Sequence, residues 1–340
     1  MDLLQPVRQY WGTVYSKSLG HELGHVALRG VTIPLMIAFI CNVCAEKNQV
    51  EHFTSEPATC SCGSNVRIRA LLHLLSLELF GHSVPVCDFP RLKAVRGLGI
   101  TDKNCYARIL EDKFDYTNTY YDREPRLDLR AAHPDRAGAY DFVLSADVLE
   151  HIAPPVESAL REVHSLLKPQ GFLGATVPCH PDGRFGEHFP DLHEYRTVPL
   201  AGKEVLINRR RDGTLEVFDD VVFHGGTGEM LEMRQFGISA LNATLRDAGF
   251  CDVFFLTSDV PEWGIIFDRD TSQPFIARKQ PYVLDRCAQS QLFDTWNHAA
   301  CEAWEARQRS EGVAAQLRLA AQSRWVRLGR KLGLGPRFEE

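Results

Sequence analysis

The sequence of 340 residues predicts an α/β protein with a doubly wound, mostly parallel sheet, and three observations lead to that prediction. From about residue 84 to residue 278, short apolar runs alternate with amphipathic segments. Residues 140–178 contain a strand, a helix and a strand in succession, which is a βαβ unit and requires parallel pairing. Hydrophobic residues make up 44% of the chain and charged residues 24%, as in a globular protein with a sizeable core.

The βαβ unit has the clearest boundaries. Its first strand is the apolar run 142–145, and Pro154-Pro155 marks the start of the helix, because proline is tolerated in a first helical turn. Residues 168–171 (Lys-Pro-Gln-Gly) are expected to end the helix, and 172–177 to form the second strand. The apolar face of this helix consists of Val156, Ala159, Leu160, Val163, Leu166 and Leu167.

The remaining elements extend the sheet on both sides. Upstream, 92–96 is predicted to be a strand that enters Gly97-Leu98-Gly99, and 114–121 is rich in β-favouring tyrosine and threonine. Downstream, a helix that ends at Gly249 is followed by strands at 253–256 and 274–278.

The alternation lapses between residues 179 and 235. There Asp212-Gly213 predicts the turn of a β-hairpin, with Arg209 to Arg211 in or next to it as a solvated turn or a phosphate contact. We expect this segment to be an insertion over the carboxyl edge of the sheet, which is where open α/β sheets bind their ligands.

Four regions follow from these patterns: an N-terminal extension (1–35), a cysteine-containing region with a helix (36–82), the α/β domain (83–280, with the insertion 179–235) and a helical tail (281–340). The tail carries arginine and lysine among leucine, valine and tryptophan. Such a basic amphipathic helix can lie on a membrane surface, dock a partner enzyme or pack on its own domain.

Charge and targeting signals narrow the classes of function. The net charge of −6 gives no general attraction to nucleic acid, so we expect no nucleic-acid partner. The first residues lack a signal-peptide pattern, and the apolar run 33–41 is too short to span a bilayer. The protein is therefore expected to be cytoplasmic, where its ten cysteines do not form a disulfide framework.

Four of the cysteines form two close pairs. Cys41 and Cys44 are separated by two residues, Cys60 and Cys62 by one, and fifteen residues lie between the pairs. Four thiolates are what a structural, tetrahedral zinc site requires, although the second pair is shorter than the usual Cys-x-x-Cys. We predict a zinc knuckle with no open position for catalysis, against the alternative of small buried cysteines in a loop. Arg67 and Arg69, just beyond it, face either substrate or solvent.

Residues 140–178 resemble a known family. The stretch Tyr-Asp-Phe-Val-Leu-Ser-Ala-Asp-Val-Leu-Glu-His (140–151), then Leu-Leu-Lys-Pro-Gln-Gly (166–171), then a strand to Pro178, is similar to the fourth strand, the following helix and the fifth strand of class I S-adenosylmethionine-dependent methyltransferases. The resemblance implies a Rossmann-like fold over about 84–278, methyltransferase activity and S-adenosylmethionine as cofactor.

The resemblance also implies where the cofactor binds. In the family a glycine-rich turn after the first strand lets the backbone approach the methionine moiety, and Gly97 and Gly99 stand there, although one glycine of the family's Gly-x-Gly-x-Gly is missing. The ribose is normally held by an acidic residue after the second strand, and the adenine by an aspartate before the fourth; the alternative for each candidate acid is a solvated loop carboxylate. The expected cofactor-binding residues are Gly97, Gly99, Asp102, Asn118 (a neutral alternative at the ribose), Asp122 (ribose), Asp128 (adenine), Asp147 and Val148.

Histidines are the candidates for a general base. Tyr-Thr-Asn-Thr-Tyr-Tyr (116–121), Glu-His-Phe-Pro (187–190) and Phe-His-Gly-Gly (223–226) resemble a bacterial subgroup associated with surface-glycan biosynthesis, which implies a sugar or glycan-related small molecule as acceptor. His188 and His224, like His193, lie in the insertion, where a histidine can deprotonate a hydroxyl or an amine or simply hold a loop. His151 is expected to orient the turn after the strand or to line the methyl-transfer site. Glu232 and Arg234 form either an ion pair or a substrate clamp.

Two other functions are weighed. The residues His21-Glu22-Leu23-Gly24-His25 match the zinc-peptidase pattern His-Glu-x-x-His, but Gly24 weakens a helix and the extended form of the motif is missing. The reduced glycine motif also leaves open a non-catalytic binding module that kept the fold.

Overall fold

The computed structural model describes residues 37–50, 59–179, 186–200, 202–224, 230–267, 272–281 and 286–323, with the backbone alone at 224, 286–293 and 321. The described residues divide into two compact units. One contains the sheet and runs to Cys87 and on from Arg91; the other comprises Asp88–Pro90 and the C-terminal helix, and each is treated by itself.

The first unit is built on a six-stranded sheet with the strand order β14-β15-β6-β5-β3-β4. Strands β4, β3, β5 and β6 run parallel to one another, whereas β15 runs antiparallel to both β6 and β14. The mostly parallel, doubly wound sheet that the sequence predicts is thereby confirmed. The strands are β3 (Leu92–Ile100), β4 (Phe114–Thr119), β5 (Tyr140–Ala146), β6 (Leu167–Val177), β14 (Asp252–Phe255) and β15 (Gln273–Arg278).

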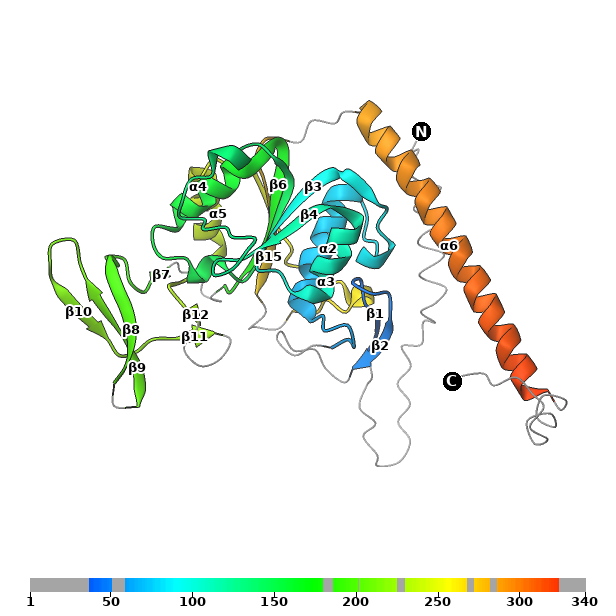
Figure 1. Ribbon diagram of the computed structural model, residues 1–340, viewed down its shortest axis with the longest axis horizontal. Coiled ribbons are helices and arrows are strands. Elements are labelled where there is room, and N and C mark those ends of the chain that lie inside the picture. Colours follow the sequence, from blue (N-terminus) through cyan, green and yellow to red (C-terminus); the bar gives the residue numbers. More distant parts are fainter. Residues whose placement is uncertain are drawn as a thin grey trace. The chain divides into compact units, whose positions relative to one another are not determined.

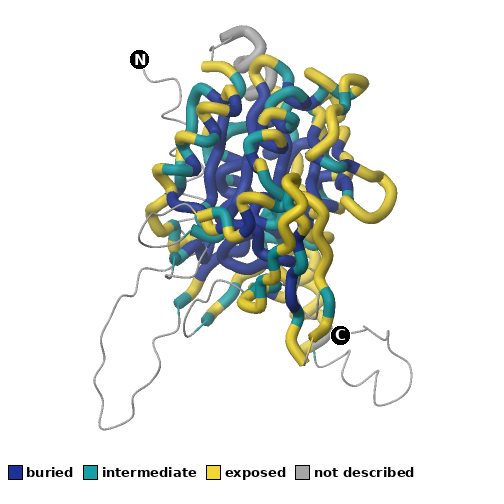
Figure 2. The backbone as a smooth tube through the Cα atoms, turned by 90° about the vertical axis from the view of Figure 1, so that its left-hand side faces the viewer, coloured by how far each residue is buried: buried dark blue, intermediate teal, exposed yellow. Residues whose placement is uncertain are grey.

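Helices cover both faces of this sheet (Figure 1). On one face lie α2 (Val66–Phe80) and α3 (Asn104–Lys113), and on the other α4 (Val156–Leu166) and α5 (Ile238–Asp247). The apolar stripe predicted for 156–167 is fully buried in a core cluster that also contains residues of β5, β6 and α5. Figure 2 shows this buried core running through the strands, with the exposed residues at the loops and the insertion.

Two local expectations were wrong. Residues 168–171 do not stop the helix: α4 ends at Leu166, Leu167 is already extended, and β6 begins there because Leu167 pairs with Tyr140. Gly171 lies inside β6, where a β-carbon would come within 2.9 Å of the Tyr140 carbonyl oxygen. Likewise Gly97 and Gly99 lie within β3, which continues to Ile100, and not in a loop after it.

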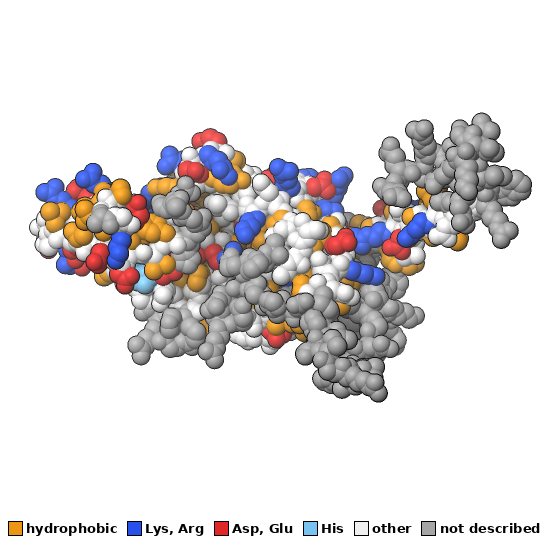
Figure 3. All heavy atoms as spheres, turned by 90° about the horizontal axis from the view of Figure 1, so that it is seen from below, with side chains coloured by type: hydrophobic (Ala, Val, Ile, Leu, Met, Phe, Trp, Pro, Cys, Tyr) orange, Lys and Arg blue, Asp and Glu red, His pale blue; other side chains and the backbone are white. Residues whose placement is uncertain are grey.

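The insertion forms small antiparallel sheets, including the hairpin predicted around Asp212-Gly213. It has its own core cluster of Phe189, Leu206, Leu231 and Met233. Viewed from below, its surface mixes basic, acidic and hydrophobic side chains (Figure 3). Its strands are β7 (Gly186–Glu187), β8 (Glu194–Leu200), β9 (Lys203–Arg209), β10 (Leu215–Phe218), β11 (Phe223–His224), β12 (Met230–Leu231) and β13 (Arg234–Gln235).

The predicted cysteine-containing region begins with a hairpin of β1 (Ile37–Ile40) and β2 (Lys47–Val50). The predicted helical tail contains α6 (Arg286–Gln322). Nowhere in the described ranges is a helix both long enough and apolar enough to cross a membrane.

Candidate active site

The strand order creates a topological switch point at the carboxyl ends of β3 and β5, where open α/β sheets bind their ligands, and we call this region the crevice. From β3 the chain crosses through α3 to β4 on one side, and it then returns to β5 on the other side of β3. The connections therefore leave in opposite directions at this point, which opens the space above the two strand ends. Ile100 pairs with Ser145, so the residues that follow these two strands meet at the same edge.

Both strands end in a strained backbone conformation. Thr101 has φ 58° and Asp147 has φ 52°, and they are two of three non-glycine residues with positive φ in the described chain. The left-handed region costs an L-residue roughly 1–2 kcal/mol, and such residues persist where the surrounding structure holds them, often at functional sites. Asp147 was predicted from the family motif, whereas Thr101 is identified only by its backbone.

The Asp147 carboxylate is held by side chains from three elements. Arg67, at the start of α2, forms an ion pair with it, and both side chains are nearly buried. Thr176 on β6 donates a hydrogen bond at 2.7 Å, as does Ser272 just before β15. The Arg67 guanidinium therefore lies beside Asp147 and does not face open solvent.

The Asp102 carboxylate is enclosed at the other side of the crevice. The Tyr106 hydroxyl donates to it at 2.7 Å and the Tyr116 hydroxyl donates to its second oxygen. Burial raises the pKa of this carboxyl to about 6, against the lowering effect of the two hydroxyls. The Asn118 side chain accepts from the Asp102 N–H and donates to its carbonyl, each at 2.9 Å, and so ties β4 to the turn at Thr101.

The two predicted glycines are covered by these same side chains. A β-carbon on Gly99 would collide with the Tyr116 hydroxyl and lie 2.6 Å from Asp102 Oδ2 and 2.9 Å from Asn118 Oδ1. A β-carbon on Gly97 would collide with the Phe142 ring. Glycine is therefore needed at these two positions because neighbouring side chains of the same chain pack against them.

Gly99→Ala should lower the free energy of unfolding by about 1–3 kcal/mol, because the added methyl overpacks a buried and hydrogen-bonded cluster. Urea unfolding measures this. The matched control is Gly186→Ala, where a β-carbon would meet nothing within 4 Å. Equal stability of the two variants would contradict the packing that we describe.

The two predicted acids beyond β4 lie outside this cluster. Asp122 is exposed. Asp128 is bound by Arg130, whose Nε and Nη2 donate to it at 3.0 and 2.9 Å, and this contact lowers its pKa. Their assignment to ribose and adenine stays a prediction, as does that of Val148, which is half-buried directly after Asp147.

The predicted histidines have different surroundings. His188 is one-third exposed, and its Nε2 lies 2.8 Å from Oε1 of the buried Glu232. His151 is nearly buried, and its Nδ1 bonds the Leu231 carbonyl at 3.0 Å, which supports the interpretation that it orients the turn after β5. For His224 only the backbone in β11 is described.

Arg234 has a structural role. It pairs with Glu187 and donates to the carbonyl oxygens of Leu149 and Ile152, which clamps the segment after β5 to the insertion. Glu232 pairs with His188 instead, so the ion pair considered between Glu232 and Arg234 is replaced by two separate pairs.

Glu150 was missed as a candidate. It is 1% exposed, and neither of its carboxyl oxygens has a hydrogen-bond partner within the described part of the chain. Burial, Asp147 and Glu232 raise its pKa well above the ordinary value, against the lowering effect of Arg67. The sequence carried a signal, because an ionisable residue between Leu149 and His151 in the family motif directly follows the strand that ends at the crevice.

The four predicted cysteines come together. Their sulfur atoms all lie within 4.8 Å of one another, with 3.7 Å between Cys41 and Cys62 and 3.5 Å between Cys44 and Cys60. Zinc–sulfur bonds of about 2.3 Å in a tetrahedron place the sulfurs about 3.8 Å apart, so the cluster fits that metal.

Arg69 joins this cluster to the rest of the first unit. It is fully buried, donates to the Ser64 carbonyl at 3.2 Å and the Gly264 carbonyl at 2.7 Å, and stacks 4.7 Å from the Phe39 ring centroid. Burial lowers its pKa to about 10, while the four nearby cysteines act in the opposite direction. The expectation that Arg69 faces substrate or solvent was wrong.

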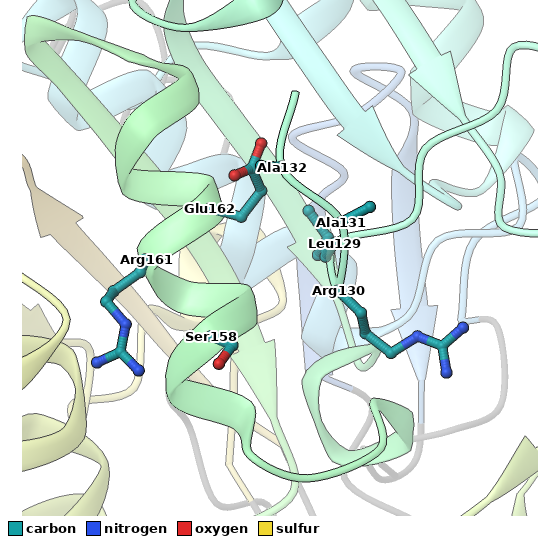
Figure 4. Close-up of a pocket in the computed structure, with 7 residues that line it drawn as sticks. All are labelled: Leu129, Arg130, Ala131, Ala132, Ser158, Arg161 and Glu162. Carbon is teal, nitrogen blue, oxygen red and sulfur yellow. The ribbon is translucent and has the colours of Figure 1, made fainter. Parts of the chain in front are cut away.

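A shallow cavity of about 230 Å³ lies beside the crevice-forming elements (Figure 4). It is lined by residues 129–132 on one side and by Ser158, Arg161 and Glu162 of α4 on the other. None of the predicted site residues lines it. We therefore take the ionisable side chains around Asp147, and not this cavity, as the candidate site.

The peptidase hypothesis rests on His21, Glu22 and His25, which lie outside the described residues. The described crevice, in contrast, combines a topological switch point, two left-handed residues and a set of buried ionisable groups.

A family model described as a methyltransferase domain matches residues 118–175, from the end of β4 through β5 and α4 into β6. No curated protein matches the chain. Similar solved structures include the citrinin polyketide synthase CMeT domain (14% identity, TM-score 0.37, covering 66% of this chain and 54% of that one). A second is a Burkholderia thailandensis 1,6-didemethyltoxoflavin-N1-methyltransferase (17% identity, TM-score 0.34, covering 62% of this chain and 79% of that one). A third is a putative S-adenosylmethionine dependent methyltransferase from Listeria monocytogenes (17% identity, TM-score 0.37, covering 63% of this chain and 99% of that one).

The chain thus spans about half the length of the first of these structures, and similarities this low say nothing about an acceptor. The family match covers the strands and helix that carry the predicted motif. On a mostly parallel sheet flanked by helices, residues 118–175 of this chain are therefore similar to a methyltransferase domain.

Proposed function

We propose that the protein transfers a methyl group from S-adenosylmethionine to a hydroxyl or an amine of a small acceptor such as a sugar. The observation that carries the proposal is the pair of left-handed residues, Thr101 and Asp147, at the two strand ends of the switch point. The methyltransferase-domain match includes β5, the strand that leads to Asp147.

The charges in the crevice fit this cofactor. S-adenosylmethionine carries a carboxylate, an ammonium and a sulfonium on its methionine end. The crevice offers the Arg67 guanidinium together with the Asp147 carboxylate. The predicted backbone contacts at Gly97 and Gly99 and the predicted polar contacts at Asp102, Asn118, Asp122 and Asp128 remain part of the proposal.

The cofactor supplies an already activated methyl group, so the protein's task is to align the acceptor and exclude water. His188 is the candidate base. It is part-exposed at the insertion and anchored by Glu232, so one ring nitrogen is fixed and the other is available to an acceptor proton.

We also propose that Cys41, Cys44, Cys60 and Cys62 bind a structural zinc ion. Four sulfur ligands leave no position for water or substrate. The cytoplasm, where thiols remain reduced, is the compartment that suits such a site. Contact of the C-terminal tail with a membrane surface or a partner enzyme stays a prediction.

Calorimetric titration tests the cofactor. S-adenosylhomocysteine should bind the full chain with a Kd on the order of 1–100 μM, within the range usual for enzyme ligands. Asp147→Asn should weaken binding about tenfold or more, because it breaks the ion pair with Arg67 that shapes the crevice.

Asp141→Asn is the matched control for this titration. Asp141 lies near the amino end of the same strand and pairs with Lys168, away from the crevice. Absence of binding by the unmodified protein at millimolar ligand would favour the second candidate, a non-catalytic module. The observation in favour of that second candidate is that the side chains of Phe142 and Tyr116 occupy the space beside Gly97 and Gly99.

A further inference from the structure

A group of ionisable side chains lies where the insertion meets the segment after β5. The Met233 N–H donates to the Glu150 carbonyl at 2.7 Å, and the His188 N–H donates to the Met233 carbonyl at 2.9 Å. Glu232 lies between two buried residues of the insertion core, Leu231 and Met233. The backbone therefore fixes Glu150, Glu232 and His188 relative to one another.

This group is rich in carboxyl groups. Besides Glu150 and Glu232 it contains Asp147, whose charge is matched by Arg67. The other titratable groups that face Glu150 are His151, whose Nε2 lies 3.7 Å from Oε1, and the Cys179 thiol. An anionic acceptor would meet carboxylates here, whereas an alcohol or an amine would meet hydrogen-bonding partners.

Glu150 indicates that a ligand reaches this group. Leaving a buried carboxyl without hydrogen bonds costs free energy, so native proteins rarely keep one without reason. Neither oxygen of Glu150 has a hydrogen-bond partner within the described residues, since His151 Nε2 lies 3.7 Å from Oε1, and the residue is 1% exposed. The next carboxyl along, Glu232, is bonded to His188.

We propose that Glu150, Glu232 and His188 form the acceptor end of the methyl-transfer site, with Glu232 as the positioning residue of His188, and that the acceptor group is an uncharged alcohol or an amine. The inference rests on the proposed function and names its acceptor class. Glu232 accepts the Nε2 proton of His188, which leaves Nδ1 to take the acceptor's proton.

The transfer step is balanced. The acceptor oxygen or nitrogen forms a bond to the methyl carbon, the carbon–sulfur bond breaks with its electron pair going to sulfur, and the acceptor proton passes to His188 Nδ1 and then to water. Glu232 stabilises the imidazolium while it exists.

Sinefungin tests the proposal without knowledge of the acceptor. It carries an amine at the position of the transferable methyl group, whereas S-adenosylhomocysteine has nothing there. Calorimetry on the full chain at pH 7.5 should show that sinefungin binds about tenfold more tightly than S-adenosylhomocysteine. The reason is that the ammonium of sinefungin contacts the carboxyl groups of Glu150 and Glu232. Glu150→Gln and Glu232→Gln should each reduce that preference to about threefold or less while changing S-adenosylhomocysteine affinity less than about twofold.

Glu162→Gln is the matched control. Glu162 also bonds a histidine, at 3.1 Å from His133 Nδ1, but on α4 beside the shallow cavity, and its replacement should leave the preference intact. The retained S-adenosylhomocysteine affinity shows that each variant is folded.

The positioning role has a spectroscopic signature. In nitrogen-detected NMR of histidine-labelled protein, the neutral imidazole of His188 should carry its proton on Nε2, and Glu232→Gln should shift that proton toward Nδ1. Glu162→Gln should leave the His188 signals in place.

Equal affinity for the two ligands in the unmodified protein, or a preference that survives both Glu150→Gln and Glu232→Gln, would overturn the inference while leaving the proposed function standing. An Nδ1-protonated His188 would likewise overturn the positioning role. Failure to bind either ligand would refute the proposed function itself, and the inference with it.

Discussion

Cys60→Ser should abolish stoichiometric zinc binding and lower the free energy of unfolding by several kcal/mol. Structural zinc sites contribute to folding directly, with apparent binding free energies on the order of 10 kcal/mol in zinc-finger peptides. Here the four sulfurs already lie within 4.8 Å of one another, so loss of one ligand leaves three thiolates that repel one another without the metal. Mass-spectrometric metal analysis and urea unfolding, both under reducing conditions, measure the two effects.

The same variant should also weaken cofactor binding, because the cysteine cluster contacts the start of α2. Cys41 Sγ contacts the Ser64 hydroxyl at 3.1 Å, and Asn65 caps α2 through the Ile68 N–H at 3.0 Å. Two residues after this cap the helix places Arg67 on Asp147. Loosening the cluster therefore loosens the start of α2 and the guanidinium that it presents.

Cys301→Ser is the control, because Cys301 is exposed on α6 in the other unit. It should leave zinc content, stability and S-adenosylhomocysteine affinity unchanged. Full-length protein that is purified without zinc, and that unfolds at the same urea concentration with and without Cys60, would refute the metal site.

Sequence patterns sufficed for the parts of the fold that depend on local periodicity. The stripe Val156 to Leu166 predicted α4, and the apolar run before Asp147 predicted β5, because burial of one face fixes both. The end of α4 was not predictable from Lys168-Pro169-Gln170-Gly171, since pairing of Leu167 with Tyr140 is a long-range contact that overrides the local stop signal.

Site residues were predictable only where they belong to a recognisable sequence motif. Asp147 was found through the resemblance to the family motif, the four cysteines through their spacing, and His188 through its residue type. Arg67 and Glu232 were ambiguous because their partners lie 80 and 44 positions away in the sequence. The meaning of Gly99 also differs from the family expectation, because the residues that cover it, Tyr116 and Asp102, approach from other elements.

Asp102 gives the protein a pH-dependent stability whose sign is set by burial. Its carboxyl is fully enclosed, and its pKa rises from 3.8 to about 6. The pKa values of both tyrosines that donate to it are raised well above their usual value by burial, so they remain donors throughout the neutral range. A folded-state pKa above the unfolded value means that the protonated carboxyl is favoured by folding. Its stabilising contribution is fully present below about pH 4 and is lost as the pH rises to about 6.

Asp102→Asn should therefore become more stable relative to the unmodified protein as the pH rises from 4 to 7, by about 3 kcal/mol, because two pH units of pKa difference correspond to about that free energy. Asparagine is neutral at both pH values and can still bond Tyr106 and Tyr116 through its amide. The measurement is the difference between urea unfolding free energies of the two proteins at each pH, in which all other titrating groups cancel. Asp115→Asn, at an exposed aspartate paired with Arg96, should show no such divergence. If the unfolding free energies of Asp102→Asn and the unmodified protein changed in parallel with pH, the Asp102 carboxyl would be ionised in the folded protein at little cost in free energy. A group other than the two tyrosines would then have to stabilise that charge at the end of β3.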